Sequence, residues 1–325
     1  MKTRFIFNPC SGRNRRNRWL VPAIRAFIAQ HRLDADLVFT RHPGHATGLA
    51  RAALVDGCER VVAVGGDGTM NEAAQALVGA AAALAIVPCG SGNGLALHLG
   101  LPTQPRRALA LIADATARVA VIDTGTANGH PFFNAMGVGF DAEISRRFNR
   151  LTRRSLTAYA RIGLAAFVRA AGQQNGQRVT ITDGNGTRET LNAFLVAVAN
   201  SDQYGNHARL APGACVDDGL LDLVALEPPG LMGAPLLVAR LFLGTFDRSP
   251  RVRRHRGARF VIQRPAPGLI HTDGETHETD ATVEITVRPR SLRLLVPATC
   301  RVVSTAAAPP SSFQPWKRNA SESAP

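Results

Sequence analysis

Lysine is nearly absent from this 325-residue sequence, in which it occurs only at Lys2 and Lys317. The chain therefore lacks the phosphate-binding lysine of P-loop nucleotide hydrolases and the strand lysine of protein kinases. It also has no Gly-x-x-x-x-Gly-Lys-Ser/Thr segment. Any phosphate that this protein binds must be met by backbone amides, arginines or a metal ion.

Paired cysteines are missing as well. The five cysteines are odd in number and scattered, and none forms a Cys-x-x-Cys motif. This pattern indicates a reducing compartment and excludes a disulfide framework. The residues are Cys10, Cys58, Cys89, Cys215 and Cys300.

Signal-peptide and membrane-spanning segments are not visible. The N-terminus leads directly into a predicted strand. The most apolar stretch, Leu231–Phe246, is interrupted by Pro235 and Arg240 and is too short to cross a bilayer. We therefore expect a cytoplasmic protein that is peripheral on the inner membrane face.

The net charge of +14 comes almost entirely from arginine. It favours an acidic partner, either an anionic membrane, a nucleic acid or a nucleotide, although arginine used as a general solubilising charge explains it equally well. We expect no nucleic acid, because only Phe148 interrupts the first of two arginine clusters and no helix-turn-helix or zinc-finger spacing occurs. The clusters are Arg146, Arg147, Arg150, Arg153 and Arg154, and then Arg251, Arg253, Arg254, Arg256 and Arg259.

Residues 1–117 alternate between predicted strands and helices. Strands that read as continuous apolar runs between helices predict an α/β domain, with a parallel sheet covered by helices on both faces. The predicted strands are Thr3–Asn8, Leu37–Thr40, Val61–Val64 and Leu84–Val87, and the predicted helices are Leu20–Gln30, Ala46–Val55, Glu72–Val78, Leu95–Leu99 and Arg107–Ala115.

Residues 118–290 change to short strands and turns. Asn128-Gly129 between two apolar runs is a strong hairpin signal, and only Leu156–Ala171 looks like an amphipathic helix. We expect a β-rich second domain here and a disordered tail over residues 304–325. Further strands are predicted at Val119–Thr126, Pro131–Val138, Val179–Thr182, Ala193–Ala199, Leu220–Leu226, Phe260–Ile262 and Val283–Val287.

The most informative motif is Val64-Gly65-Gly66-Asp67-Gly68-Thr69-Met70-Asn71-Glu72, which follows a buried strand and opens a helix. Glycines there allow a phosphate to approach the backbone, and amides at a helix N-terminus point at its oxygens. Asp67 is suited to orient a metal or a hydroxyl. A structural interpretation coexists with this one, because Thr69 and Glu72 have the spacing of a capping box.

Three further motifs accompany the first. Asn8–Gly12 and Pro88–Gly94 also follow strands, so they should meet the first motif at the carboxyl edge of the sheet, where α/β proteins bind ligands. Asp273-Gly274-Glu275 stands late in the chain. The alternation of His271, Asp273, Glu275 and His277 suggests a transition-metal site, but Asp273-Gly274 favours a turn that breaks the alternation.

This ordered set resembles the diacylglycerol kinase catalytic family, which includes bacterial lipid kinases and sphingosine kinases. The resemblance runs from Phe5 to about Pro297 and includes Thr40 with Gly44, Gly137-x-Gly139-Phe140-Asp141, and Ala211-Pro212-x-Ala214-x-x-Asp217-Asp218-Gly219-Leu220-Leu221-Asp222. It implies an N-terminal nucleotide domain, a C-terminal β-sandwich, ATP in the cleft between them, and a return of Ser291–Val296 to the first domain, within a returning segment near residues 291–303.

The resemblance also implies residue roles. Asp67 would organise Mg–ATP and Glu275 would be the base, although some branches of the family give the base role to the aspartate at position 67. A structural Mg²⁺ would be bound by the carboxylate of Asp218 and the carbonyls of Cys215 and Leu220, unless this is an ordinary Asp-Gly turn. The expected ATP contacts are Asn8, Ser11, Gly12, Thr40, Gly65, Gly66, Asp67, Gly68, Thr69, Met70, Asn71, Ser91, Gly92 and Asn93.

The lipid head group stays open. Gly94 follows Asn93 where many bacterial members have an aspartate, which is closer to sphingosine kinases, and Asp141 and Glu143 are candidate substrate contacts. We expect an ATP-dependent kinase that phosphorylates a primary hydroxyl of diacylglycerol or a sphingoid lipid at an anionic membrane surface. An NAD kinase and a catalytically silent lipid- or nucleotide-binding regulator are the alternatives, and self-association into a homodimer is left open.

Overall fold

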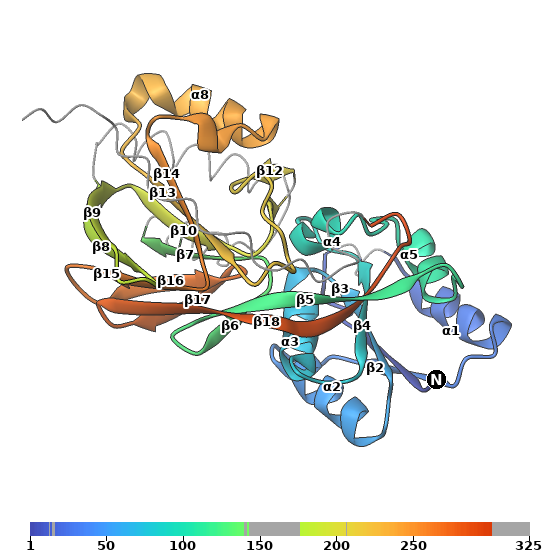
Figure 1. Cartoon of the computed structure of the whole chain (residues 1–325). Coiled ribbons are helices and arrows are strands. Elements are labelled where there is room, and N and C mark those ends of the chain that lie inside the picture. Colours follow the sequence, from blue (N-terminus) through green and yellow to red (C-terminus); the bar gives the residue numbers. More distant parts are fainter. Residues whose placement is uncertain (13, 15–16, 140–141, 143–175, 206, 301–325) are drawn as a thin grey trace, which may run out of the picture.

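The computed structural model describes residues 1–12, 14, 17–139, 142, 176–205 and 207–300 as two parts that lie side by side (Figure 1). Several predictions fall outside these residues. They concern the substrate contacts Asp141 and Glu143, the first arginine cluster, the amphipathic stretch Leu156–Ala171 and the tail from Ser304 onward.

The first part is the predicted α/β domain, in which four parallel strands lie in the order β2-β1-β3-β4. Its core consists mainly of aliphatic side chains from these strands and from the helices that cover them. The strands are β1 (Thr3–Phe7), β2 (Ala35–Phe39), β3 (Arg60–Gly65) and β4 (Ala83–Pro88), and the helices are α1 (Leu20–Gln30), α2 (His45–Val55), α3 (Asp67–Leu77), α4 (Gly94–His98) and α5 (Pro105–Ile112).

Helix α3 begins at Asp67, well before the predicted Glu72, and this overturns the capping-box interpretation. Gly66 is the N-cap residue, so Thr69 lies inside the first turn. The hydroxyl of Thr69 accepts a hydrogen bond from Asn8 Nδ2 (2.9 Å), and the Glu72 carboxylate accepts one from the amide of Ala46 (3.0 Å). Both side chains therefore join α3 to other segments instead of capping it.

The second part is the predicted β-sandwich. A six-stranded sheet in the order β14-β13-β10-β7-β16-β17 packs through a shared core on β18, β15, β8 and β9. The elements are β5 (Arg118–Ala127), β6 (His130–Phe132), β7 (Ala135–Gly139), β8 (Gln177–Asp183), β9 (Arg188–Ala193), β10 (Leu195–Ala199), β11 (Gln203–Gly205), β12 (Ala208–Arg209), β13 (Leu221–Leu226), α8 (Gly230–Leu243), the 3₁₀ turn η1 (Phe246–Arg248), β14 (Val252–Gly257), β15 (Arg259–Gln263), β16 (Gly268–Thr272), β17 (Glu275–Thr279) and β18 (Thr282–Val296).

The predicted hairpin at Asn128-Gly129 is confirmed. Ala127 pairs with His130, and both turn residues have positive φ, 46° and 83°, as a tight two-residue hairpin requires. The apolar run after the turn is not one strand, however. It divides into β6, which stays with β5, and β7, which joins the six-stranded sheet.

The long strand β18 connects the two parts (Figure 1). It pairs antiparallel with β15 and β5, and Leu294 near its end pairs parallel with Leu84 of β4. The register with β5 shifts between Arg288 and Leu292, where Arg290 has a positive φ of 48°. One ten-stranded sheet therefore runs through both parts. The resemblance implied that Ser291–Val296 returns to the first domain, where Leu294 pairs with Leu84, but it did not imply that the strands of both parts form one sheet.

Candidate active site

Three loops meet at the carboxyl edge of the parallel sheet, as their positions after β1, β3 and β4 predicted. The Gly66 amide donates to Ser11 Oγ (2.6 Å), which joins the first loop to the second. The Cys89 amide donates to the carbonyl of Gly65 (2.6 Å), which joins the third loop to the second. The loops thus form one continuous backbone surface at the start of α3.

Several glycines in these loops are required by loop packing. A Cβ at Gly90 would lie 2.7 Å from the Cα of Gly66, and a Cβ at Gly12 would collide with the carbonyl of Cys89. Gly68 is different, because the residue is exposed and a Cβ added to it would meet nothing within 4 Å. Packing therefore explains why positions 12 and 90 are glycine. It does not explain the glycine at position 68, where close approach of a ligand is a possible reason.

Asp67 holds the third loop. It is the first residue of α3, and its two carboxylate oxygens accept hydrogen bonds from the amides of Asn93 (2.8 Å) and Gly94 (3.0 Å) at the start of α4. Burial raises the pKa of this carboxyl, and the two amides oppose that effect. Asp67 thus acts as a cap for α4 from outside that helix, a role that the sequence did not suggest.

The other predicted nucleotide contacts line the same edge but differ in what they can offer. The side chains of Thr69 and Met70 are buried. The Met70 amide also donates to the carbonyl of Gly66 (3.1 Å), so it is not available to a ligand. Thr40 is also buried, and its amide donates to the carbonyl of Phe7 (3.0 Å). Asn93 has a positive φ of 50°, and its Oδ1 accepts from the amide of Gly90 (3.2 Å).

The Asp273-Gly274 turn joins β16 to β17 and breaks the alternation of side chains, as predicted. No group of three or more His, Cys, Asp or Glu side chains suited to a metal occurs in the described part of the chain. The Asp273 carboxylate instead accepts four hydrogen bonds. Its donors are Asn71 Nδ2 (2.8 Å) and the amides of Phe133 (2.7 Å), Asn134 (2.9 Å) and Ala135 (2.9 Å).

Glu275 follows this turn and has an exposed side chain. Partial desolvation by the surrounding protein raises the pKa of its carboxyl, and the nearby carboxylates of Glu72 and Asp273 raise it further. Because Asp273 is bonded to Asn71 of α3, Glu275 is held close to the helix that carries the Gly-Asp-Gly motif. Asp67 begins this same helix, so both predicted catalytic carboxylates are connected to α3.

His271 links the Asp273-Gly274 turn to Tyr204. Its Nδ1 accepts from the amide of Gly274 (3.3 Å), and its Nε2 lies 2.8 Å from the hydroxyl of Tyr204. An acceptor role at Nδ1 leaves the proton on Nε2 when the ring is neutral, so this nitrogen donates to Tyr204. The sequence motif identified His271 only as a metal candidate.

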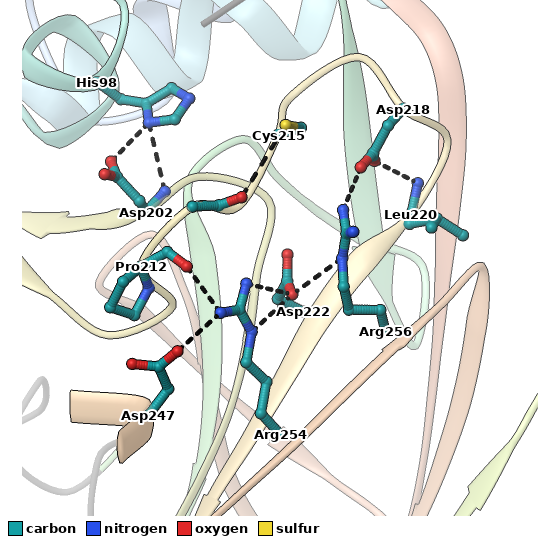
Figure 2. Close-up of polar contacts among 11 residues, drawn as sticks. His98, Asp202, Pro212, Cys215, Asp218, Leu220, Asp222, Asp247, Arg254 and Arg256 are labelled. Carbon is teal, nitrogen blue, oxygen red and sulfur yellow. Dashed lines mark hydrogen bonds and ion pairs between the residues drawn. The ribbon is translucent and has the colours of Figure 1, made fainter. Parts of the chain in front are cut away.

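Two further contacts cross between the domains, and neither was predicted. Nδ1 of the buried His98, in α4, lies 2.6 Å from the carboxylate of Asp202 (Figure 2). Asn134 fills the space beside Gly94, where an added Cβ would lie 2.8 Å from its Nδ2. Gly94 is thus the smallest residue at a crowded domain junction, which gives its departure from the family pattern a steric reason.

The predicted Mg²⁺ turn is arranged around an arginine (Figure 2). One oxygen of the Asp218 carboxylate pairs with Arg256, and the other accepts from the amide of Leu220 (3.0 Å). The thiol of Cys215 points to the carbonyl of Gly213. A cation at this turn would compete with Arg256 for the carboxylate of Asp218. Binding of Mg²⁺ by this carboxylate and the carbonyls of Cys215 and Leu220 stays a prediction.

The second arginine cluster is largely paired. Arg254 bonds the buried Asp222 (2.8 Å) and lies 3.4 Å from Asp247, as Figure 2 shows. Arg253 pairs with Glu227 (3.5 Å). Most of its charge is therefore used inside the domain and is not a free patch for an anionic partner.

Comparison with known proteins agrees with this architecture. Residues 2–127 match the diacylglycerol kinase catalytic domain, and residues 134–296 match the YegS C-terminal NAD kinase beta sandwich-like domain. A crystal structure of a putative diacylglycerol kinase from Bacillus anthracis aligns with a TM-score of 0.76 at 24% identity, covering 92% of this chain and 96% of that one. At this identity the structural likeness shows the fold alone.

The sequence relatives establish the family. A probable lipid kinase YegS-like protein of Pseudomonas fluorescens is 31% identical over 84% of this chain and 90% of its own length. A protein with the same description from Pseudomonas aeruginosa is 32% identical over 85% of this chain and 90% of its own. The chain belongs to the YegS-like lipid kinases of the diacylglycerol kinase catalytic family. None of its described helices is both long and apolar enough to cross a bilayer.

Proposed function

We propose that this protein is an ATP-dependent lipid kinase that transfers the γ-phosphate to a primary hydroxyl of diacylglycerol or of a sphingoid-type lipid. One observation carries the proposal most directly. The exposed carboxylate of Glu275 has a raised pKa and stands on a turn that is bonded, through Asp273 and Asn71, to the helix that follows the Gly-Asp-Gly loop. A base is thus fixed relative to the anion-binding end of α3.

The family implies ATP as phosphoryl donor, and the loops suit its phosphates. Helix α3 has no side-chain cap at Gly66, so its first-turn amides remain available for an anion, which the helix dipole also favours. Gly68 leaves open space beside these amides. The phosphates would lie along Gly66–Asn71, with Asn8, Ser11, Gly12 and Thr40 on one side and Ser91–Asn93 on the other.

Mg²⁺ would neutralise charge on those phosphates, and Asp67 is the residue that fits it best. Each of its oxygens accepts one hydrogen bond, and a carboxylate oxygen has a second acceptor site for a hard cation. Asp67 is thereby fixed in position by the α4 amides before any ligand arrives. This division of labour assigns Asp67 to the donor side of the reaction and leaves the base role to Glu275.

Glu275 would accept the proton of the acceptor hydroxyl as the hydroxyl oxygen forms its bond to the γ-phosphorus and the bond to ADP breaks. A positioned base of this kind contributes about 10²–10⁴-fold to the rate. Correct in-line placement of the two reactants contributes at least as much. The raised pKa matches the task, because a stronger base shares the proton more effectively at neutral pH.

A half-open and mainly apolar pocket of about 230 Å³ in the second domain is suited to part of an acyl chain. It lies at the end of β7, β8, β9 and β10. Its lining among the described residues includes Val138, Val179, Ala193, Phe194 and Val196. A lipid whose chain lies here would be held by the same domain that carries Glu275.

The test is Glu275→Gln, measured as phosphate transfer to lipid and, separately, as ATP binding. The amide keeps the shape but cannot take a proton, so we expect transfer to fall by about 10²–10⁴-fold while ATP affinity stays within a factor of about two. Glu278→Gln, an exposed glutamate on the same strand, is the matched control. Unchanged transfer in Glu275→Gln would show that the base lies elsewhere.

A further inference from the structure

Helix α8 has an apolar face that nothing in the described structure covers. It lies at the outer edge of the second domain, beside β12 and η1 and away from the nucleotide domain (Figure 1). Three large side chains on it are strongly exposed: Leu236 (58%), Phe242 (52%) and Leu243 (75%). Pro235 and Ala239 are exposed as well, at spacings that place all five on one side of the helix.

The opposite face of α8 is apolar as well. Ala234 and Leu237 are buried, and Leu237 packs with Phe246 and Leu226 in the core on that side of the sheet. A helix that is apolar around its whole circumference normally has both faces covered. Here only one face is packed, so the exposed residues are in excess of what the fold requires.

The helix itself carries charge of one sign only. No Asp or Glu occurs between Pro228 and Phe246. Arg240 on the helix and the exposed Arg248 just after it have no carboxylate partner among the described residues, in contrast to Arg253 and Arg254. An apolar stripe with unpaired arginines is the composition of a helix that lies in the interface of an anionic membrane.

We propose that the face formed by Pro235, Leu236, Ala239, Phe242 and Leu243, here called the α8 face, docks this protein on an anionic lipid bilayer. The inference rests on the proposed function in one respect, namely that a lipid acceptor is presented by a membrane. Docking would insert the apolar side chains among the acyl chains and leave Arg240 and Arg248 at the level of the phosphates. It would hold the second domain, with its mainly apolar pocket, against the source of substrate.

A second copy of the chain is the less favoured occupant. Self-association through the α8 face would bring the same unpaired arginines of two copies together, and each copy carries a net charge of +14. An anionic surface has the opposite effect and attracts both the arginines and the whole molecule. Charge complementarity therefore selects the membrane.

Sedimentation with sonicated vesicles tests this without any catalytic step. Full-length protein should bind phosphatidylglycerol vesicles, with affinity that falls as salt rises and that is much lower on phosphatidylcholine. The double variant Phe242→Ser/Leu243→Ser should bind at least tenfold more weakly, because each large side chain loses its burial in lipid. Arg240→Gln/Arg248→Gln should weaken binding about tenfold or more and reduce its salt dependence. Val55→Ser, at an even more exposed apolar site on α2, should bind like the wild type.

Activity separates this inference from the proposed function. The Phe242→Ser/Leu243→Ser variant should phosphorylate a short-chain, water-soluble acceptor at the wild-type rate and lose activity only on vesicles. If the wild type phosphorylates no lipid yet binds vesicles through this face, the proposed function fails and the docking stands. Equal vesicle binding by the wild type and the variant would overturn the docking. A variant whose assembly in solution has a different mass from the wild type, but which binds vesicles equally, would overturn it too, because the α8 face would then join two copies. Should the double variant misfold, Phe242→Trp with brominated phosphatidylglycerol gives a second measurement: quenching is expected, and its absence would contradict insertion.

Discussion

Glu275 is the residue whose surroundings best match a chemical role. Its pKa is raised by partial desolvation and by Glu72 and Asp273, so its ionised form is disfavoured in the folded protein. Glu275 must be ionised to act as a base, and activity should therefore be lost as pH falls through a pKa higher than that of an ordinary glutamate. A pH profile of kcat/KM should show this acidic limb, and Glu275→Gln should abolish it.

The same shift makes a prediction about stability. For a carboxyl whose folded pKa is raised, folding binds a proton, so its contribution favours the folded state as pH falls through that pKa and opposes it at neutral pH. Glu275→Gln should therefore leave the free energy of unfolding at pH 7 unchanged or slightly higher, measured by urea denaturation. A clear loss of stability would mean that Glu275 is a structural residue.

Replacement of Asp273, unlike replacement of Glu275, should destabilise the protein. Its carboxylate accepts four hydrogen bonds, so Asp273→Asn leaves buried donors facing an amide nitrogen. We expect a loss of about 1–3 kcal/mol in urea denaturation, together with lower activity because the turn before Glu275 is released. Asp280→Asn, at an exposed aspartate of the same domain, should change neither. Full stability in Asp273→Asn would contradict the positioning role.

The sequence identified the chemistry of these residues better than their partners. Asp273 and Glu275 stand out in an Asp-Gly-Glu motif, but the donors that fix Asp273 are 140 and 202 residues away at Phe133 and Asn71. Local patterns carry no information about such contacts. For the same reason the motif did not reveal that Asp67 caps α4, or that Arg256 takes the carboxylate of Asp218.

At the scale of elements, the three glycine loops act as one packed unit. Gly90→Ala would force its methyl group against the backbone of Gly66, which cannot move aside as a flexible side chain does. We expect a loss of about 1–3 kcal/mol in stability and weaker ATP binding, read by urea denaturation and by titration with ATP. Gly48→Ala, in α2 with open space around it, is the matched control and should be neutral or stabilising. Equal behaviour of the two variants would refute the packing argument.

Most element boundaries followed from periodicity, since alternation of buried strands and helices is a local property. The start of α3 did not. Thr69 and Glu72 have the pattern of a capping box, but Gly66 is the N-cap. The two polar side chains instead accept hydrogen bonds from Asn8 and from the amide of Ala46. Tertiary hydrogen bonds outweighed the local signal here.

At the scale of the whole molecule, β18 makes the two domains one structure. It pairs with strands of both, and its buried Leu294 lies in the core of the first domain. The described chain should therefore unfold in a single calorimetric transition, and Leu294→Ala should lower its midpoint without splitting it, at a cost of about 2–5 kcal/mol. Two separate transitions in the wild type would show that the domains are energetically independent.

Transfer of labelled phosphate from ATP with Mg²⁺ tests the central claim most directly. The acceptors are diacylglycerol, sphingosine, ceramide and NAD, presented in mixed micelles and assayed side by side with the wild type and Glu275→Gln. The account predicts a labelled lipid with the wild type and a loss of about 10²–10⁴-fold with the variant. Label on NAD alone, or no label on any acceptor while ATP is still bound, would contradict it.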